Sequence, residues 1–275
     1  MTMKIKSGIF NITQPLVMGI INLTPNSFFV DSRVQNQHEA EQKIAYLIEN
    51  QADIIDIGAM STRPECEIIS EKEEWQRLEP VLKFINKNFP DKIFSIDTFR
   101  AEIAKRAVLD FGIDIINDIS GGNFDNKMFE IVALCSCPYI LTHIQGNLQT
   151  MHNSFDYQDI TNDVIYYFSK KINELHLLGV SDIIIDPGFG FSKSADNNFL
   201  LMKNLDKLNI FDLPILVGIS RKRIVWETLG ITSNEALNGT TALNMFALTQ
   251  GANILRVHDV DAAKQCVNLF RKIKK

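Results

Sequence analysis

Short apolar runs alternate with amphipathic stretches along the whole of the 275-residue chain. The apolar runs are rich in isoleucine and valine, which is typical of strands that are buried on both faces of a parallel sheet. We therefore predict strands at residues 16–21, 54–57, 93–96, 113–116, 139–141, 183–185, 215–217 and 254–257.

The stretches between these runs repeat their apolar residues with the period of a helix. In residues 38–50, for example, Ala40, Ile44 and Leu47 share one helical face. The predicted helices cover residues 38–50, 71–88, 100–110, 125–135, 161–178, 195–208, 233–250 and 259–273. Each predicted strand is thus followed by a predicted helix.

Strict alternation of strand and helix indicates a parallel sheet, because each right-handed crossover between parallel strands needs a helix. Eight such units in about 250 residues match a closed (β/α)8 TIM barrel. The alternative is an open doubly wound sheet, which normally shows a glycine fingerprint after its first strand. Here that position reads INLTPNSFF. Without a linker or low-complexity segment, residues 1–275 are expected to form a single domain, and the residues through Gln14 a hairpin that closes the barrel bottom.

Composition excludes several classes of protein. The net charge of −5 gives no support for nucleic-acid binding, and no apolar run reaches the length of a membrane span. The first residues lack the apolar core of a signal peptide. Cys135 and Cys137 are too close for a zinc knuckle or a thioredoxin-type pair, so we expect Cys66, Cys135, Cys137 and Cys266 to be free thiols in a reducing cytoplasm. A disulfide would require an exported protein.

The segment DIIIDPGFGFSK, residues 182–193, carries the first candidate site. Pro187 holds Asp186 extended at the end of a buried strand, and Gly188 and Gly190 permit backbone angles that other residues resist. A fixed carboxylate beside Phe191 suits a planar heterocycle with ring N–H groups. The alternative is an aspartate that only caps a helix.

Polar residues follow most of the other predicted strands, and a barrel would bring them to one mouth. Together with Asp186 they are Asn22, Thr62, Arg63, Asp97, Asn117, His143, Lys222, Arg256 and His258. Each alone could be a turn residue, a helix cap or a core histidine. Together they would form a site of mixed sign, with acids for a polar ring and cations and amides for an anion. Loops 24–37, 59–70 and 145–157 are candidate lids.

Nine segments between Val17 and Val260 resemble dihydropteroate synthase, an enzyme family of the folate pathway. They are MGIINLTPNSF, ADIIDIG, STRP, FSIDTF, INDISGG, THIQGN, DIIIDPGFGFSK, LVGISRK and ILRVHDV. The resemblance implies a (β/α)8 barrel that joins 4-aminobenzoate to 6-hydroxymethyl-7,8-dihydropterin pyrophosphate, giving 7,8-dihydropteroate and pyrophosphate. It further implies Mg²⁺, a homodimer and a target of sulfonamides, and the cytoplasmic location is the one expected from the free thiols.

The resemblance also implies roles for individual residues. It assigns the pterin to Asp97, Asn117, Asp186, Gly218, Lys222 and Arg256. It places Asn22, Arg63, Arg256 and His258 around the pyrophosphate, with Mg²⁺ on Asn22. It places Thr62, Arg63, Pro64, Phe191 and Lys222 at the 4-aminobenzoate pocket, and it implies catalytic roles for Asp97, Lys222, Arg63 and His258. The expected reaction is a dissociative substitution without a covalent enzyme intermediate.

The chain departs from the family pattern at four positions. Asn26 stands where Asp is usual, Met60 and Glu65 flank the STRP segment, and Arg223 replaces a serine after SRK. Arg223 could pair with the aminobenzoate carboxylate or turn to solvent. Two rivals remain: a pterin-dependent methyltransferase, which lacks the STRP and SRK segments, and a non-catalytic pterin-binding relative, which needs no residues for a leaving group.

Overall fold

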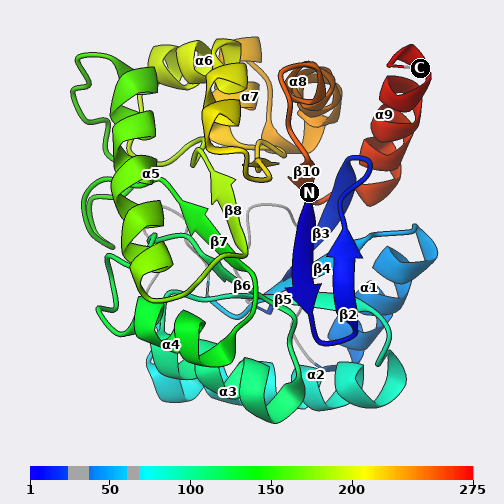
Figure 1. Ribbon diagram of the computed structural model, residues 1–275. Coiled ribbons are helices and arrows are strands. Elements are labelled where there is room, and N and C mark those ends of the chain that lie inside the picture. The colour runs from blue at the N-terminus through cyan, green and yellow to red at the C-terminus, as the bar shows by residue number, and fades with distance from the viewer. Residues whose placement is uncertain (24–36, 61–67, 275) are drawn as a thin grey trace.

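The computed structural model of the protein describes residues 1–23, 37–60 and 68–274, and its centre is a barrel of parallel strands (Figure 1). The strand order is β8-β7-β6-β5-β4-β3-β10-β9. A bridge between Ile185 and Ile215 joins the first strand of this order to the last, and the Ile185 N–H donates to the Pro214 carbonyl at 2.9 Å. The barrel strands are β3 (Leu16–Asn22), β4 (Ile54–Gly58), β5 (Ile93–Asp97), β6 (Ile115–Asp118), β7 (Tyr139–Thr142), β8 (Ile183–Asp186), β9 (Leu216–Val217) and β10 (Ile254–Val257). The predicted (β/α)8 barrel is confirmed, and the open sheet is excluded.

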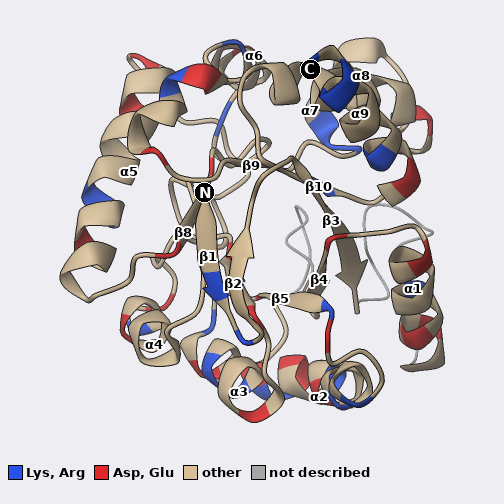
Figure 2. Cartoon of the chain, turned by 45° about the vertical axis from the view of Figure 1, so that its right-hand side comes forward, with Lys and Arg blue, Asp and Glu red and all other residues tan. Residues whose placement is uncertain are grey.

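Helices surround the barrel (Figure 1). They are α1 (Gln37–Glu49), α2 (Glu71–Asn88), α3 (Ala101–Phe111), α4 (Met128–Cys135), α5 (Ile160–Leu177), α6 (Ala195–Lys203), α7 (Arg223–Leu229), α8 (Leu237–Thr249) and α9 (Val260–Ile273), with 3₁₀ turns η2 (Leu205–Phe211) and η3 (Ser233–Glu235). Charged residues are concentrated on these helices, whereas the barrel strands are largely uncharged (Figure 2). In the part of the chain that the structure describes, no helix is long and apolar enough to cross a bilayer.

Four predicted elements have other boundaries in the structure. The predicted helix 195–208 ends as α6 at Lys203 and is followed by the 3₁₀ turn η2. The predicted helix 233–250 is divided: a capping box of Thr232 and Glu235 begins the short turn η3, and α8 begins separately at Leu237. The predicted helix 125–135 begins only at Met128, since the Asp125 carboxylate accepts the Ala101 N–H at 2.8 Å. The predicted strand 113–116 begins at Ile115. Helix α7 was not predicted, because its seven residues are too few to show a clear period.

Side chains along each barrel strand alternate between the helices and the interior. Inward residues near the strand starts form a bottom cluster of Met3, Ile12, Leu16, Met18, Ile54, Ile115, Ile140, Ile184, Leu216 and Ile254. Two residues further along, the inward positions carry Asp56, Asn117, Asp186 and Arg256 instead. Apart from the two-residue β9, the barrel strands are thus apolar at their starts and polar at their ends, which concentrates the chemistry at one mouth.

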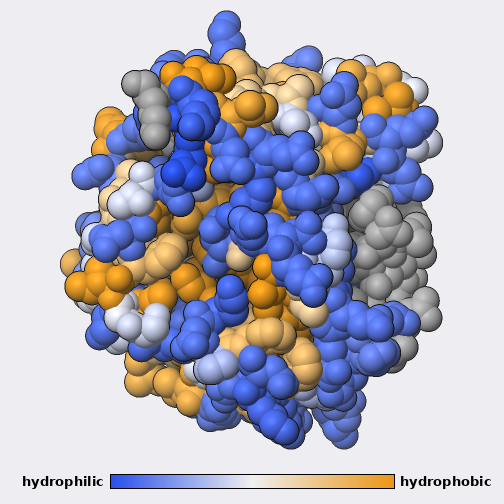
Figure 3. Space-filling model, turned by 90° about the vertical axis from the view of Figure 1, so that its right-hand side faces the viewer, coloured by the Kyte–Doolittle hydropathy of each residue, from blue (hydrophilic) through white to orange (hydrophobic). Residues whose placement is uncertain are grey.

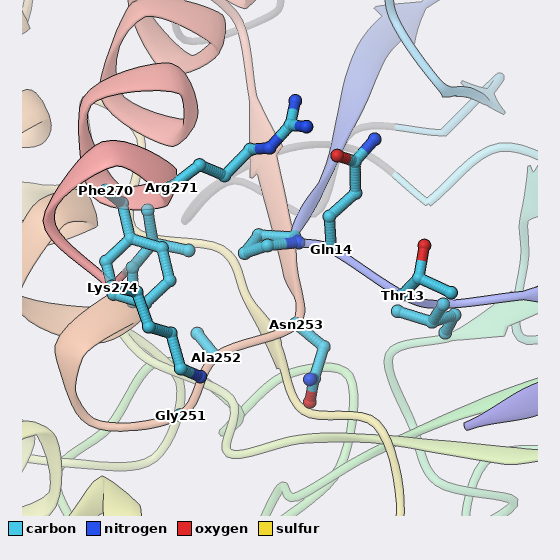
Figure 4. A pocket seen from close by; sticks show the side chains of 11 residues that line it. Thr13, Gln14, Gly251, Ala252, Asn253, Phe270, Arg271 and Lys274 are labelled. Carbon is cyan, nitrogen blue, oxygen red and sulfur yellow. The ribbon is translucent and has the colours of Figure 1, made fainter.

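The N-terminal hairpin closes the opposite end of the barrel, as predicted. Strands β1 (Thr2–Ile5) and β2 (Gly8–Asn11) are antiparallel, and Met3 belongs to the bottom cluster. The Lys4 N–H donates to the Asp182 carboxylate at 3.1 Å, which ties the hairpin to the start of β8. A surface hollow of about 570 Å³ lies where the hairpin meets α9, lined by Gln14, Asn253 and Arg271 among others (Figure 4). It shares no residue with the mouth.

Candidate active site

The ends of β3, β4, β5 and β6 are in register, and they set one row of the mouth. Asn22 pairs with Gly58, Gly58 with Asp97, and Asp97 with Asn117. The opposite side is formed by Asp186 at the end of β8 and by Gly218, directly after β9. Residues more than 190 positions apart in the sequence therefore surround one opening, as the barrel topology requires.

One side of the mouth, here called the acidic wall, consists of Asp56, Asp97, Asn117 and Arg256. The Arg256 guanidinium donates from Nε to Asp56 Oδ2 at 2.6 Å and from Nη2 to Asp97 Oδ2 at 2.5 Å. The Asn117 amide donates to the same Asp56 oxygen at 2.9 Å. Asp56 Oδ1 is buried without a hydrogen-bond partner. The wall thus holds two carboxylates with one cation between them and retains an acceptor that is not used.

The electrostatics of the acidic wall follow from this imbalance. The pKa of Asp97 is raised to about 7, because burial and the negative charge of the neighbouring Asp56 outweigh the attraction of Arg256. Burial lowers the pKa of Arg256, but Asp56 and Asp97 together more than reverse this and raise it above the ordinary value. Arg256 is therefore always charged, whereas the charge of Asp97 depends on pH near neutrality.

The other side, here called the lysine wall, consists of Asp186 at the end of β8 and of Lys193 and Lys222 on the loops after β8 and β9. Asp186 Oδ1 accepts the Gly188 N–H at 2.8 Å, and burial raises its pKa against the opposing charge of Lys222. No helix starts at Asp186, since α6 is capped by Ser194 instead. Gly188 has a φ of 68°, and a Cβ there would lie 2.1 Å from the His143 carbonyl, so this turn requires glycine.

Lys222 follows β9, the strand that pairs with β10 and Arg256, and both side chains lie beside Gly218. The Lys222 Nζ donates to the Phe189 carbonyl at 2.5 Å and lies 4.6 Å from the centroid of the Phe191 ring. Burial lowers the pKa of Lys222 to about 8, although Asp186 partly opposes this. Phe191 is 9% exposed and faces the mouth, whereas Phe189 is fully buried in the barrel core. Of the two phenyl rings, only Phe191 can cover a ligand.

Lys193 is a buried amine that the sequence did not single out. Its Nζ donates to the carbonyls of Gly188 at 3.0 Å, Phe191 at 3.2 Å and His143 at 3.5 Å. Burial lowers its pKa to about 7, with Asp186 acting in the opposite direction. Three acceptors match the three N–H bonds of an ammonium group, so Lys193 fixes the loop that carries Phe191.

The loop 145–157, a predicted lid, packs on that same loop. Ser192 Oγ accepts the Gln145 N–H at 3.1 Å, and the Ser192 N–H donates to the Met151 carbonyl at 2.7 Å. The ring of His152 lies 5.6 Å from that of Phe191. Residues 145–157 therefore border the mouth beside Phe191.

His258 lies directly after β10, which pairs with β3. The ring Nδ1 of His258 is 3.1 Å from Ser220 Oγ, and the backbone N–H of His258 donates to the same oxygen at 3.2 Å. Burial and the charge of Arg256 lower the pKa of His258 to about 3. At pH 7 the ring is therefore a neutral, hydrogen-bonding imidazole.

His143, the remaining strand-end candidate, is a core residue. It is 1% exposed, its ring contacts Tyr167 edge-on at 4.8 Å, and burial lowers its pKa well below the ordinary value. It does not reach the mouth.

Thr62, Arg63 and Pro64 lie outside the described residues, as do Asn26, Glu65 and most of the first two predicted lids. Within the described ranges, no group of three His, Cys, Asp or Glu side chains could hold a metal ion. Asn22 offers a half-buried amide oxygen at the end of β3. A single oxygen ligand suits Mg²⁺, which usually takes one or two protein ligands together with substrate phosphates and water. The donor set therefore fits the metal.

Sequence reasoning overlooked Asp56 and Lys193. Asp56 interrupts the apolar strand IIDIG at an inward position, and an acid inside such a strand is the signal that could have revealed it. Lys193 ends the segment GFGFSK, but nothing in the sequence shows that its amine turns back into the loop.

Comparison with known proteins agrees with this site. The sequence profile of pterin-binding enzymes matches residues 18–258, so the chain belongs to that family. It is 40% identical to the dihydropteroate synthase of Synechocystis sp. over 90% of this chain and 86% of the relative. The Yersinia pestis dihydropteroate synthase, solved in a sulfonamide drug complex, superimposes with a TM-score of 0.94 at 33% identity, covering 100% of this chain and 99% of the other. The Xanthomonas albilineans enzyme with 7,8-dihydropteroate gives a TM-score of 0.84 at 28% identity, with coverage of 99% and 98%.

Proposed function

We infer that the protein is a dihydropteroate synthase, which transfers the dihydropterin-methyl group from its pyrophosphate ester to 4-aminobenzoate. The observation that carries this inference is the pairing of two buried walls of opposite character around one mouth. The acidic wall presents acceptors for the N–H groups of a pterin, and the lysine wall presents donors for its carbonyl oxygen and ring nitrogens.

In the proposed complex, Asp97, Asn117, Asp186 and Lys222 bind the pterin edge. Arg256 keeps its planar guanidinium between Asp56 and Asp97, where one face can stack on the pterin ring. Gly218 lies beside Lys222 and Arg256 and leaves room for the ring. Phe191 and Lys222, with Thr62, Arg63 and Pro64, border the 4-aminobenzoate pocket.

The chemistry requires no nucleophile from the protein. The bond between the exocyclic carbon and the pyrophosphate oxygen breaks, and the resulting carbocation is conjugated with the pterin ring. Ionised Asp97 and Asp186 favour this positive charge. The aromatic amine then attacks the carbon and loses its proton. We propose that Asn22, Arg63, Arg256 and His258 surround the departing pyrophosphate. Mg²⁺ held by Asn22 and the phosphate oxygens would neutralise the charge of the leaving group.

The primary test is release of pyrophosphate in a coupled assay, with and without 4-aminobenzoate. A synthase releases pyrophosphate in step with consumption of 4-aminobenzoate. A non-catalytic pterin-binding relative would release none, and a pterin-dependent methyltransferase would instead transfer a methyl group from methyltetrahydrofolate. Asp186→Asn is expected to weaken pterin binding by about tenfold to a hundredfold, because hydrogen bonds to charged groups contribute roughly 1.5–3 kcal/mol. Near-parental turnover would remove Asp186 from the site.

We further propose that sulfonamides compete with 4-aminobenzoate, that the protein is cytoplasmic, and that it forms a homodimer through α7 and α8. The outer face of these helices exposes Leu229, Leu237 and Phe246, which are 54%, 37% and 40% exposed. Apolar side chains also gather at the top of Figure 3, on the side of the molecule where α8 lies. Sedimentation of the protein and of Phe246→Glu tests this: a parental protein that sediments as a monomer would contradict the dimer.

A further inference from the structure

Thr98 follows Asp97 directly, at the point where the chain leaves the barrel sheet. Asp97 ends β5, and its carboxylate accepts from Arg256 in the mouth. Because side chains alternate along a strand, Thr98 points the other way, toward the surrounding helices. Thr98 is 3% exposed, and α3 begins only at Ala101. The sheet therefore fixes the chain as far as Asp97, and the contacts of Thr98 fix the turn that follows.

A buried acid on α2 holds the side chain of Thr98. Thr98 Oγ1 donates to Glu74 Oε1 at 2.7 Å, and Glu74 is 1% exposed. The backbone N–H of Thr98 donates to the Asn117 carbonyl at 3.0 Å. The side chain of Thr98 is thus tied to a helix, while its backbone is tied to β6, the strand that carries another residue of the acidic wall.

Arg100 completes this network and compensates the charge of Glu74. Its Nη1 donates to Glu74 Oε2, and its Nη2 donates at 2.5 Å to the carbonyl of Ile69, the residue before the N-cap Ser70 of α2. The Arg100 N–H donates to Thr98 Oγ1 at 3.2 Å. Burial raises the pKa of Glu74, against the hydrogen bond from Thr98 and the charge of Arg100. Side chains therefore join the start of α2 to the turn after β5.

We propose that the contact between Glu74 and Thr98 positions the Asp97 carboxylate for the pterin. An apolar residue at position 74 would serve packing alone, whereas a buried acid is unfavourable unless it is paired. Here the acid holds the residue next to Asp97, and Arg100 keeps it paired. Glu74 and Thr98 are positioning residues that act through Asp97. The inference rests on the proposed function, since that function assigns Asp97 to the pterin.

The test measures binding of the pterin substrate by calorimetric titration in the full chain and in Thr98→Val. Valine keeps the shape of threonine and leaves the ion pair of Glu74 and Arg100 in place, but it cannot donate to Glu74. We expect affinity to fall by about tenfold, since a hydrogen bond from the pterin to a misaligned carboxylate loses much of its strength. Thr98→Ser keeps the hydroxyl and should restore affinity close to the parental value.

Steady-state kinetics separates positioning from a general loss of stability. In Thr98→Val, KM for the pterin substrate should rise while KM for 4-aminobenzoate stays near the parental value, because Asp97 belongs to the acidic wall. Urea unfolding measures the stability of each variant separately. Glu79→Gln is the matched control on α2, since Glu79 forms a partly exposed ion pair with Lys83 at 3.0 Å, and both KM values should be unchanged. Thr98→Ala repeats the test with a smaller side chain.

Three results would overturn the role of this contact while leaving the proposed function intact. They are parental pterin affinity in both Thr98→Val and Thr98→Ala, a loss of affinity in Thr98→Ser as large as in Thr98→Val, and an equal rise of both KM values. A failure of the proposed function is read from the parental protein instead. A parental protein that neither binds the pterin nor releases pyrophosphate would contradict that function, and the role of Thr98 with it.

Discussion

The acidic wall and the lysine wall face each other across one mouth but compensate buried charge in different ways. On the acidic wall, Asp56 and Asp97 share the cation Arg256, and side chains bind side chains. On the lysine wall, Lys193 and Lys222 donate to backbone carbonyls. The first arrangement depends on strands, which fix its geometry. The second depends on a loop, and its amines in turn determine the shape of that loop.

This difference predicts how each wall responds when one of its cations is removed. Removing the cation from the acidic wall leaves two carboxylates facing each other without compensation. Removing an amine from the lysine wall leaves carbonyls that the loop can turn towards water. Changes to the acidic wall should therefore have larger effects than changes to the lysine wall.

The largest effect is expected for Arg256→Met. Breaking a buried ion pair from one side costs about 3–5 kcal/mol, and here two carboxylates lose their partner. We expect a large fall in the midpoint of urea unfolding and a loss of pterin binding of at least about a hundredfold, since each tenfold corresponds to about 1.4 kcal/mol. Calorimetric titration with the pterin substrate measures the binding. Arg271→Met, on the exposed last turn of α9, is the matched control. A stable Arg256→Met protein with parental affinity would show that the acidic wall does not bind the pterin.

Lys193→Met should have a smaller and more selective effect. The substitution keeps the length of the side chain but removes donors to three carbonyls, which should cost about 2 kcal/mol of stability. Because two of those carbonyls, of Gly188 and Phe191, belong to the loop that carries Phe191, we expect KM for 4-aminobenzoate to rise more than kcat falls. Steady-state kinetics with each substrate varied in turn test this, with Lys203→Met on α6 as control. Equal changes in both KM values would indicate a general loss of stability instead.

The two walls were also unequally accessible to prediction from sequence. Strand ends are visible as apolar runs that stop at a polar residue, so Asp97, Asn117 and Asp186 could be placed at the mouth in advance. Asp56 was missed because strands buried on both faces read as continuously apolar, and the inward polar position in IIDIG was not separated from its neighbours. Lys193 was missed because a contact between an amine and three carbonyls arises only from the path of the loop.

The hydrogen bonds within the site could not be predicted from the sequence either. The resemblance to dihydropteroate synthases implied that Arg256 binds the pterin. It did not indicate that Asp56 and Asp97 hold the guanidinium in place before any ligand arrives. Nor did it indicate that burial keeps His258 neutral. Both results depend on which side chains the barrel excludes from water.

The pH dependence of kcat/KM tests the ionisation of one residue from each wall. Asp97, with a pKa of about 7, is protonated below neutrality, so its function as an acceptor increases as pH rises through 7. Lys222, with a pKa of about 8, loses its charge above that pH. We therefore expect a narrow bell between these two values. Asp56→Asn removes a like charge from the neighbourhood of Asp97, which lowers the pKa of Asp97 and moves the acid limb to lower pH. An acid limb that stays in place, or an alkaline limb that moves with it, would contradict this assignment.

Arg223→Ser should have the smallest effect, because Arg223 belongs to neither wall. Its Nε donates to Glu227 Oε1 at 2.5 Å along the outer face of α7, and its side chain is 68% exposed. Of the two alternatives for this residue, the structure describes the one that turns to solvent. Exposed ion pairs of this kind contribute about 0–1 kcal/mol, so KM for 4-aminobenzoate and the inhibition constants of sulfonamides should change by less than about fivefold. Glu227→Gln is a more direct test, because it removes the carboxylate that pairs with Arg223. A marked increase in affinity for 4-aminobenzoate in Glu227→Gln, abolished by adding Arg223→Ser, would show that the guanidinium reaches the carboxylate.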